Sequence, residues 1–202
     1  MELFEFAQSG HSHKARLMLS LLQLPYKSVL VNGANLEQKT ESFLRMNPFG
    51  QVPVLKDGET VVWDSQAILV YLARQYAEPS WLPLDAAVMS RVMAWLSIAT
   101  NELVRGPAAL RVHYKLGRAI SLEDAQQLTA TLLKILEQHL QAEDWLAAAH
   151  ITIADIAIYP YISLAPEGKV DLTPYPAICR WLSRIQALPN YVGMPGMWAN
   201  PD

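Results

Sequence analysis

The chain has 202 residues, enough for one large domain or two modest ones. Apolar residues make up 51% and charged residues 17%, a balance typical of a globular chain and not of a disordered one. The net charge of -3 and the lack of clustered Lys and Arg with interleaved aromatic residues argue against nucleic acid as a partner. No apolar run approaches the ~20 residues that a membrane-spanning helix needs, so we expect no membrane partner.

Cysteine usage and the start of the chain indicate the compartment. Cys179 is the only cysteine, so an internal disulfide is excluded. The stretch from Met1 to Phe6 lacks the basic region and the apolar segment of a signal peptide. We therefore expect a cytoplasmic protein.

The chain opens with a strand, a loop and a helix. Residues 3–6 are a short apolar strand, and after Ser9 and Gly10 the apolar residues adopt helical spacing until Pro25. Residues 26–31 are rich in aromatic and branched side chains and predict a second strand. This βαβ order favours a parallel strand pair.

A hairpin and a capped helix follow. Residues 32–46 are polar and weakly periodic, which predicts a short irregular helix. Asp57 and Gly58 form a two-residue turn that accepts positive φ, and they join two antiparallel strands, residues 52–56 and 59–63. Asp64 and Ser65 then supply the cap of a helix that continues to residue 76.

These elements predict an α/β unit with a mixed four-stranded sheet over residues 1–77. Residues 78–85 contain two prolines and are interpreted as a linker. Residues 86–202 contain no convincing alternation of apolar and polar residues, the pattern of a strand, which predicts an all-helical second domain. Its helices are expected at residues 86–105, 122–140, 153–164 and 177–188.

A capping box marks one helix of this second domain. Thr152 and Asp155 have the spacing at which a hydroxyl and a carboxylate each satisfy an amide at the helix start. Isoleucines surround this pair, so we expect the helix to cross the core and assign Asp155 a structural role.

Four blocks of sequence occur in order along the chain: residues 9–16 (SGHSHKAR), 47–55 (NPFGQVPVL), 64–68 (DSQAI) and 152–155 (TIAD). In this order and at these intervals the chain resembles the cytosolic glutathione transferase family, of bacterial type with a serine-type active site. Asp64 departs from the family pattern, where Glu is more common, and His11 stands where a small residue, Asn or Cys is often found. The resemblance implies a thioredoxin-like glutathione-binding domain followed by a helical domain that holds an electrophile.

The second block is expected to hold the main chain of glutathione. An extended peptide can bind a free backbone amide and carbonyl beside a sheet, and Val52 is placed to offer them. The resemblance implies a cis bond between Val52 and Pro53 and places Gln51 at the same site. An ordinary trans proline at the start of a strand is the alternative.

The third block is expected to hold the charged end of the ligand. A helix N-terminus with free amides and a hydroxyl suits a carboxylate. The resemblance therefore implies that Ser65 binds the γ-glutamyl carboxylate and that Asp64 lies near the amino group, although both residues could simply cap the helix. Lys39 matches a stretch that contacts the glycyl carboxylate, and a solvated surface lysine is its alternative.

The chemistry depends on the glutathione thiol, whose thiolate is the nucleophile and whose unperturbed pKa is about 8.5. Resemblance to serine-type relatives implies that Ser9 donates a hydrogen bond to the thiolate. Ser12, one turn later, is expected to be the N-cap and is the second candidate for this bond. His11 is the third, and the alternative for His11 and His13 is that they are exposed residues at the start of the helix.

The electrophile is expected between the loop after the first strand and the helices after the linker. Candidate lining residues share this stretch of helix, whose spacing equally suits mixed faces: Asn101, Val104, Arg105, Arg111 and Tyr114. Residues 191–198 either fold back over this pocket or form a loose tail.

We therefore expect an enzyme that conjugates the glutathione thiolate to small hydrophobic electrophiles. No metal site is expected, and glutathione is the co-substrate. The family implies a homodimer. The alternatives are a glutathione-dependent peroxidase or disulfide reductase, and a binding or regulatory protein without turnover. The first block has no cysteine, which weighs against thiol transfer, and Cys179 is expected to be a core residue.

Overall fold

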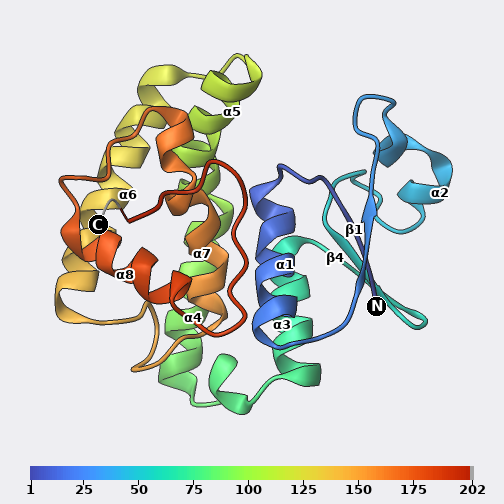
Figure 1. Cartoon of the computed structure of the whole chain (residues 1–202), viewed down its shortest axis with the longest axis horizontal. Coiled ribbons are helices and arrows are strands. Elements are labelled where there is room, and N and C mark those ends of the chain that lie inside the picture. Colours follow the sequence, from blue (N-terminus) through green and yellow to red (C-terminus); the bar gives the residue numbers. More distant parts are fainter. Residues whose placement is uncertain (201–202) are drawn as a thin grey trace.

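The fold comes from a computed structural model of the chain that describes residues 1–200. Figure 1 shows the strands and the short helix α2 (Glu41–Leu44) on one side and a group of helices on the other. Helices α1 (Gly10–Leu21) and α3 (Ser65–Tyr76) lie between these two halves. The thioredoxin-like unit followed by an all-helical unit is confirmed.

The sheet has four strands in the order β2-β1-β3-β4. Strand β1 (Glu2–Glu5) pairs in parallel with β2 (Lys27–Leu30) and antiparallel with β3 (Val54–Asp57), which pairs antiparallel with β4 (Thr60–Trp63). The hairpin is confirmed, but its two-residue turn is Gly58-Glu59 and not Asp57-Gly58, because Asp57 still pairs with Thr60. Gly58 takes a φ of +56° in this turn. The irregular helix predicted at residues 32–46 is a short 3-10 turn, Glu37–Lys39, followed by α2.

The second half is helical throughout its regular structure. Its elements are the 3-10 turn Pro79–Trp81, α4 (Ala86–Thr100), a π-helical segment (Val104–Ala108), α5 (Ala109–Leu116), α6 (Leu122–Ala142), α7 (Ile153–Ser163), the 3-10 turn Ala165–Gly168 and α8 (Pro176–Gln186). No helix within residues 1–200 is both long enough and apolar enough to span a membrane.

The sequence prediction was wrong about the region after α4. A single helix was expected through residue 105, but α4 ends at Thr100 and a separate helix, α5, follows. Gly106 has a non-helical backbone (φ −94°, ψ −107°), and Pro107 lacks the amide that a continuous helix would use. The first break is at Asn101, whose backbone is non-helical (φ −114°, ψ −81°), and the kink at Gly106 and Pro107 follows it before α5.

Helix α7 passes through the core, and the predicted capping box holds its start. The side chain of Thr152 accepts from Ala154 N at 3.2 Å, and Asp155 Oδ2 accepts from Thr152 N at 2.9 Å. Asp155 Oδ1 also accepts from Leu146 N and from Trp181 Nε1, both at 3.0 Å. The buried carboxylate therefore joins three segments of the helical half, which supports its structural role.

One hydrophobic cluster spans both halves of the molecule. It includes Leu3 and Ile68 from the sheet unit and Ile156 and Trp181 from the helical unit, all with 0% exposure. Helix α1 packs against α3 on one side and α7 on the other. The N-terminus of α1 is therefore fixed at the seam between the two halves.

The capping-box carboxylate yields a stability prediction. Asp155→Asn replaces one accepting oxygen with an amide group, so two of the buried donors lose their partner. We expect the free energy of unfolding to fall by about 3 kcal/mol or more, measured by urea denaturation. The exposed turn variant Asp171→Asn is the control and should change it by less than about 1 kcal/mol. Equal losses in the two variants would contradict a special role for Asp155.

Candidate functional site

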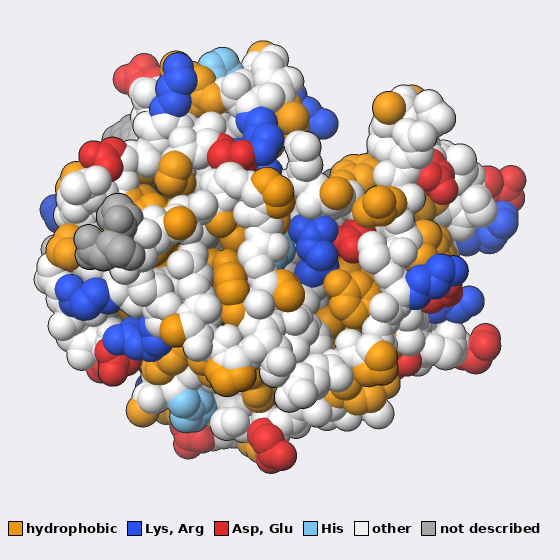
Figure 2. Space-filling model, viewed as in Figure 1, with side chains coloured by type: hydrophobic (Ala, Val, Ile, Leu, Met, Phe, Trp, Pro, Cys, Tyr) orange, Lys and Arg blue, Asp and Glu red, His pale blue; other side chains and the backbone are white. Residues whose placement is uncertain are grey.

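A cavity of about 680 Å³ opens between the sheet unit and the helical unit. Figure 2 shows the surface hollowed between the lobe that carries α5 and the lobe that carries α2. The wall from the sheet unit is mostly polar: Phe6, Gln8, Ser9, His11, Gln38, Lys39, Asn47, Gly50, Gln51, Val52, Pro53, Trp63, Asp64, Ser65 and Gln66. The wall from the helical unit is more apolar: Thr100, Val104, Arg111, Val112, Leu116, Arg118 and Tyr161.

The loop before β3 forms one side of the cavity. The bond between Val52 and Pro53 is cis, as the resemblance implied. Val52 lies ahead of the first registered pair of β3, and Asn47 holds this loop by donating from Nδ2 to Gln51 O at 2.8 Å. Gly50 has a φ of +58°, and a Cβ there would lie 2.6 Å from Gln38 O, so only glycine fits.

The start of α3 forms the adjoining corner. Asp64 caps the helix, because its Oδ1 accepts from Gln66 N at 2.8 Å and from Ala67 N at 3.1 Å. Its φ is +76°, a conformation that costs a non-glycine residue on the order of 1–3 kcal/mol and that concentrates at functional sites. Ser65 begins the helix and faces the cavity, so a hydroxyl and the positive end of the helix dipole point into the same space.

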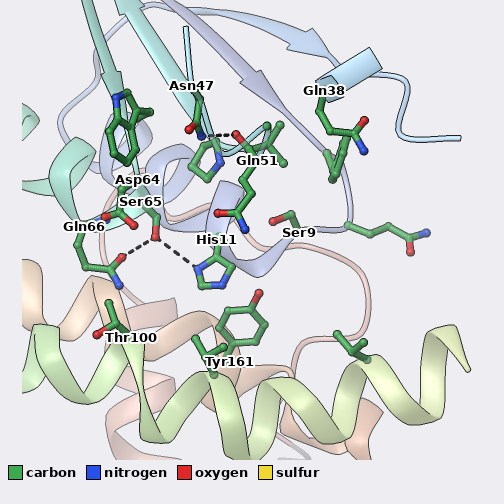
Figure 3. A pocket seen from close by; sticks show the side chains of 18 of the residues that line it. Ser9, His11, Gln38, Asn47, Gln51, Asp64, Ser65, Gln66, Thr100 and Tyr161 are labelled. Carbon is green, nitrogen blue, oxygen red and sulfur yellow. Dashed lines mark hydrogen bonds between the residues drawn. The ribbon is translucent and has the colours of Figure 1, made fainter. Parts of the chain in front are cut away.

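Ser65 links α3 to α1 through a side-chain network (Figure 3). Its Oγ lies 2.5 Å from Gln66 Oε1 and 3.4 Å from His11 Nδ1. Burial and the nearby Lys14 charge lower the pKa of His11 to about 3. The His11 imidazole is therefore neutral at physiological pH and adds no positive charge to the cavity.

The expectation that His13 is exposed was wrong. The side chain is completely buried on the inner side of α1, and burial lowers its pKa to about 3. His11 is also mostly covered, because its ring packs edge-on against Tyr161 with the centroids 5.0 Å apart. Only His11 of the two lines the cavity.

The structure separates the two serine candidates. Ser9 is the N-cap of α1, since its Oγ accepts from Ser12 N at 3.2 Å, and it lines the cavity. The prediction that Ser12 is the N-cap was therefore wrong. Ser12 is completely buried, and its hydroxyl has no hydrogen-bond partner within residues 1–200. An N-cap hydroxyl accepts with its oxygen, so the hydroxyl proton of Ser9 is left to donate into the cavity.

The other predicted residues divide between the cavity and its surroundings. Lys39 lines the cavity and donates from Nζ to Phe49 O at 2.9 Å. Of the five predicted electrophile residues, Val104 and Arg111 line it. Arg105 is exposed and donates from Nη1 to Asn101 Oδ1 at 3.4 Å. Tyr114 lies at a separate, smaller hollow, beneath the ammonium group of Lys169.

Sequence reasoning missed most of the helical wall. Val112 and Leu116 of α5, and Arg118 just after it, line the cavity and were not identified. Tyr161 lies far along the chain in α7, and its only sequence signal is its place after the capping box. Residues 191–198 contain Tyr191, whose hydroxyl lies 2.6 Å from that of Tyr159, so this segment packs on α7.

Arg111 brings a partly satisfied positive charge to the helical wall. Its Nε donates to Glu167 Oε2 at 2.6 Å, and its side chain is 5% exposed. Its Nη2 is buried and has no hydrogen-bond partner within residues 1–200. A buried guanidinium nitrogen in this state favours an anionic ligand nearby.

Lys14 is a second buried cation behind the opposite wall. It is completely buried, and its Nζ lies 3.5 Å from Gln66 Oε1. Burial lowers the pKa of Lys14 to about 7, and the carboxylate of Asp64 partly opposes that shift. Among the described residues no group of three or more His, Cys, Asp and Glu is arranged to hold a metal ion.

Family comparisons cover both halves of the chain. Residues 8–75 match the family described as "Glutathione S-transferase, N-terminal domain", and residues 88–189 match "Glutathione S-transferase, C-terminal domain".

Named relatives differ in the reaction that their names describe. The chain is 30% identical to a zeta-class glutathione S-transferase of Euphorbia esula, covering 95% of this chain and 88% of that protein. It is 29% identical to the disulfide-bond oxidoreductase YfcG of Escherichia coli, over 91% of this chain and 89% of that one. It is 31% identical to a maleylpyruvate isomerase of Ralstonia sp, over 88% of each.

Solved structures have the same architecture. A possible glutathione S-transferase from Rhodopseudomonas palustris superposes with a TM-score of 0.89 at 32% identity, covering 98% of each chain. A glutathione transferase homologue from Drosophila mojavensis with bound glutathione has a TM-score of 0.83 at 28% identity, over 93% of this chain and 88% of that one.

The lowered pKa of Lys14 predicts how stability depends on pH. Between about pH 7 and the unfolded value near 10.5, the unfolded chain keeps the Lys14 proton and the folded chain has released it. Stability contributed by this residue therefore rises with pH through that window. In Lys14→Met the rise should be absent, so the variant should gain stability relative to wild type at about pH 6.5 and lose that advantage by about pH 9.5.

Urea unfolding across this pH range measures the effect. Lys27→Met is the matched control, because Lys27 is an exposed lysine, and its curve should run parallel to that of wild type. If Lys14→Met also runs parallel to wild type, Lys14 has an ordinary pKa in the folded protein.

Proposed function

The chain belongs to the glutathione S-transferase family, and from that premise we propose that it conjugates the glutathione thiolate to small hydrophobic electrophiles. Membership makes it a glutathione-dependent enzyme of this family. One observation carries the choice of reaction and site. The Ser9 hydroxyl, the cis peptide at Val52 and the start of α3 at Ser65 all face one cavity.

Glutathione would bind along the polar wall. Its main chain would pair with the backbone of Val52. Its γ-glutamyl carboxylate would accept from the Ser65 amide and from the Ser65 hydroxyl, whose proton would turn from Gln66 Oε1 to the ligand, because Asp64 already occupies the Gln66 and Ala67 amides. Asp64 uses Oδ1 for capping, which leaves Oδ2 to accept from the ligand's ammonium group. Lys39 would form an ion pair with the glycyl carboxylate, at the end of glutathione opposite the γ-glutamyl group. The peptide would then extend toward Ser9.

The thiolate would form at the N-terminus of α1. Ser9 would donate a hydrogen bond to the sulfur, and the positive end of the helix dipole would stabilise the same charge. The neutral state of His11 supports a hydroxyl donor over an imidazolium at this position. The thiolate then attacks the electrophilic carbon, the carbon–sulfur bond forms, and the leaving group departs with the bonding electrons.

The electrophile would lie against the helical wall. Val104, Val112 and Leu116 supply apolar surface, which suits a hydrophobic acceptor. Arg111 offers its buried Nη2 to an anionic group on that acceptor.

Arg111 also favours a second candidate reaction, the cis–trans isomerisation of an unsaturated carboxylate. In that reaction the thiolate adds to the double bond, the single bond rotates, and glutathione is expelled unchanged. The relative named maleylpyruvate isomerase supports it. The relative named disulfide-bond oxidoreductase likewise supports disulfide reduction by the same thiolate. A panel containing an aryl halide, an unsaturated dicarboxylate, a hydroperoxide and a mixed disulfide separates these reactions.

We further propose a cytoplasmic homodimer. Cys179 is a free thiol, which suits a reducing compartment. The rings of Phe49 and Trp63 lie 5.5 Å apart and are 62% and 40% exposed, and together they provide an apolar contact for a second copy. Light scattering or ultracentrifugation of wild type and Phe49→Ala measures the oligomeric state.

Removal of the Ser9 hydroxyl tests the mechanism. Ser9→Ala should raise the pKa of bound glutathione by about one unit or more and slow conjugation of an aryl halide about tenfold or more at neutral pH, because a bond to a charged group is lost. The glutathione Kd should change little. Ultraviolet titration of the bound thiolate gives the pKa. Ser12→Ala is the control, and an effect in Ser12→Ala alone would transfer the role to Ser12.

Removal of the Ser65 hydroxyl tests the binding site. Ser65→Ala should weaken glutathione binding about tenfold or more in calorimetry, with little change in the thiol pKa, because the carboxylate loses one donor. Ser90→Ala, at an exposed serine of α4, should leave the affinity unchanged. The proposal fails altogether if wild type takes up no glutathione at millimolar concentration.

A further inference from the structure

Tyr161 extends from the helical unit to the start of α1. A Cβ at Gly10 would lie 2.8 Å from Tyr161 Cζ and slightly farther from the two neighbouring ring carbons. The carbon that bears the hydroxyl is therefore the part of the ring closest to Gly10. Only a residue without a side chain allows this approach, so the ring and the first turn of α1 are packed directly together.

This packing puts the Tyr161 hydroxyl beside the site proposed for the sulfur. In Figure 3 the hydroxyl points toward the space between His11 and Ser9. Tyr161 is 7% exposed yet lines the same cavity as Ser9. The hydroxyl therefore faces the cavity from a largely dry position, where a hydrogen bond to a charged group is strong.

The Tyr161 hydroxyl keeps its proton and can act as a hydrogen-bond donor. In the first turn of α1, Ser12 N donates to Ser9 Oγ and His13 N donates to Ser9 O. A hydroxyl carries one proton and two acceptor lone pairs, so the Tyr161 oxygen can donate its proton into the cavity that it lines. Burial raises the pKa of Tyr161 to about 12, with Arg111 and the His11 amide opposing, so the proton stays on the oxygen at neutral pH.

We propose that the Tyr161 hydroxyl donates a second hydrogen bond to the glutathione thiolate, so that each half of the molecule supplies one hydroxyl to the sulfur. This inference rests on the proposed function, because it requires glutathione in the cavity with its sulfur at the start of α1. The thiol proton leaves to solvent, and Tyr161 keeps its own proton throughout.

The same helix offers a matched control. Tyr159 lies two positions earlier in α7, so it points to a different face, and its hydroxyl lies 2.6 Å from that of Tyr191. Both tyrosines belong to the same core cluster. Tyr159→Phe and Tyr161→Phe therefore each remove one hydroxyl from α7, but only Tyr161→Phe removes one from the cavity.

The experiment measures the pKa of glutathione bound to each variant by ultraviolet titration, together with its Kd by calorimetry. In Tyr161→Phe the bound thiol pKa should rise by about one unit, the Kd should stay within about twofold, and conjugation at neutral pH should slow about tenfold. The rate should recover as the pH is raised past the new pKa. Tyr159→Phe should match wild type in all three measurements.

Two outcomes would overturn the inference. If Tyr161→Phe slows conjugation but leaves the bound thiol pKa unchanged, the hydroxyl acts on the acceptor and not on the sulfur. If both variants raise the pKa equally, the effect comes from altered packing of α7. A wild type that binds glutathione with a lowered thiol pKa keeps the proposed function intact in either case, whereas a wild type that does not bind it overturns that function first.

Discussion

Helix α1 packs on two sides at once, and the position of the site follows from this. One face contacts α3 over the sheet, the other contacts α7, and the buried residues of all three belong to one cluster. The start of α1 therefore cannot move without disturbing both halves. Gly10 brings this end within direct contact of the Tyr161 ring. Groups from distant parts of the chain are held around one helix N-terminus, which is the geometry that favours an anion.

The charged and neutral side chains around the start of α1 favour an anionic ligand. Burial keeps the imidazole of His11 neutral, while Lys14 behind one wall and Arg111 in the other are buried cations with few partners. Arg111 is ion-paired with Glu167 through Nε, but its Nη2 has no partner within residues 1–200, and an anion close to that nitrogen would satisfy it. Asp64 is the opposing charge, and its strained backbone keeps the carboxylate at the start of α3. The cavity thus has buried cationic side chains on both sides and one carboxylate at the start of α3.

Local signals in the sequence predicted the turns and helix caps of both units. The turn at Gly58, the cap at Asp64 and the capping box at Thr152 each depend on contacts within a few residues, so their spacing along the chain is sufficient. The continuous helix through residue 105 was wrong, because Asn101 leaves helical geometry and ends α4. The cap at Ser12 was also wrong. Two serines three residues apart are equally compatible with a cap until the helix start is known.

The family, the order of elements and the two blocks around Val52 and Ser65 that line the cavity could be predicted from the sequence, because short segments with defined local geometry encode them. Tertiary structure alone decided which hydroxyls face the cavity, that His13 is buried while His11 is only partly covered, and that Tyr161 contacts α1. Those properties depend on how α1, α5 and α7 pack across large separations in the chain. The burial of a side chain and its contacts with distant residues depend on the packing of the complete fold, and the spacing of residues within one segment does not specify them.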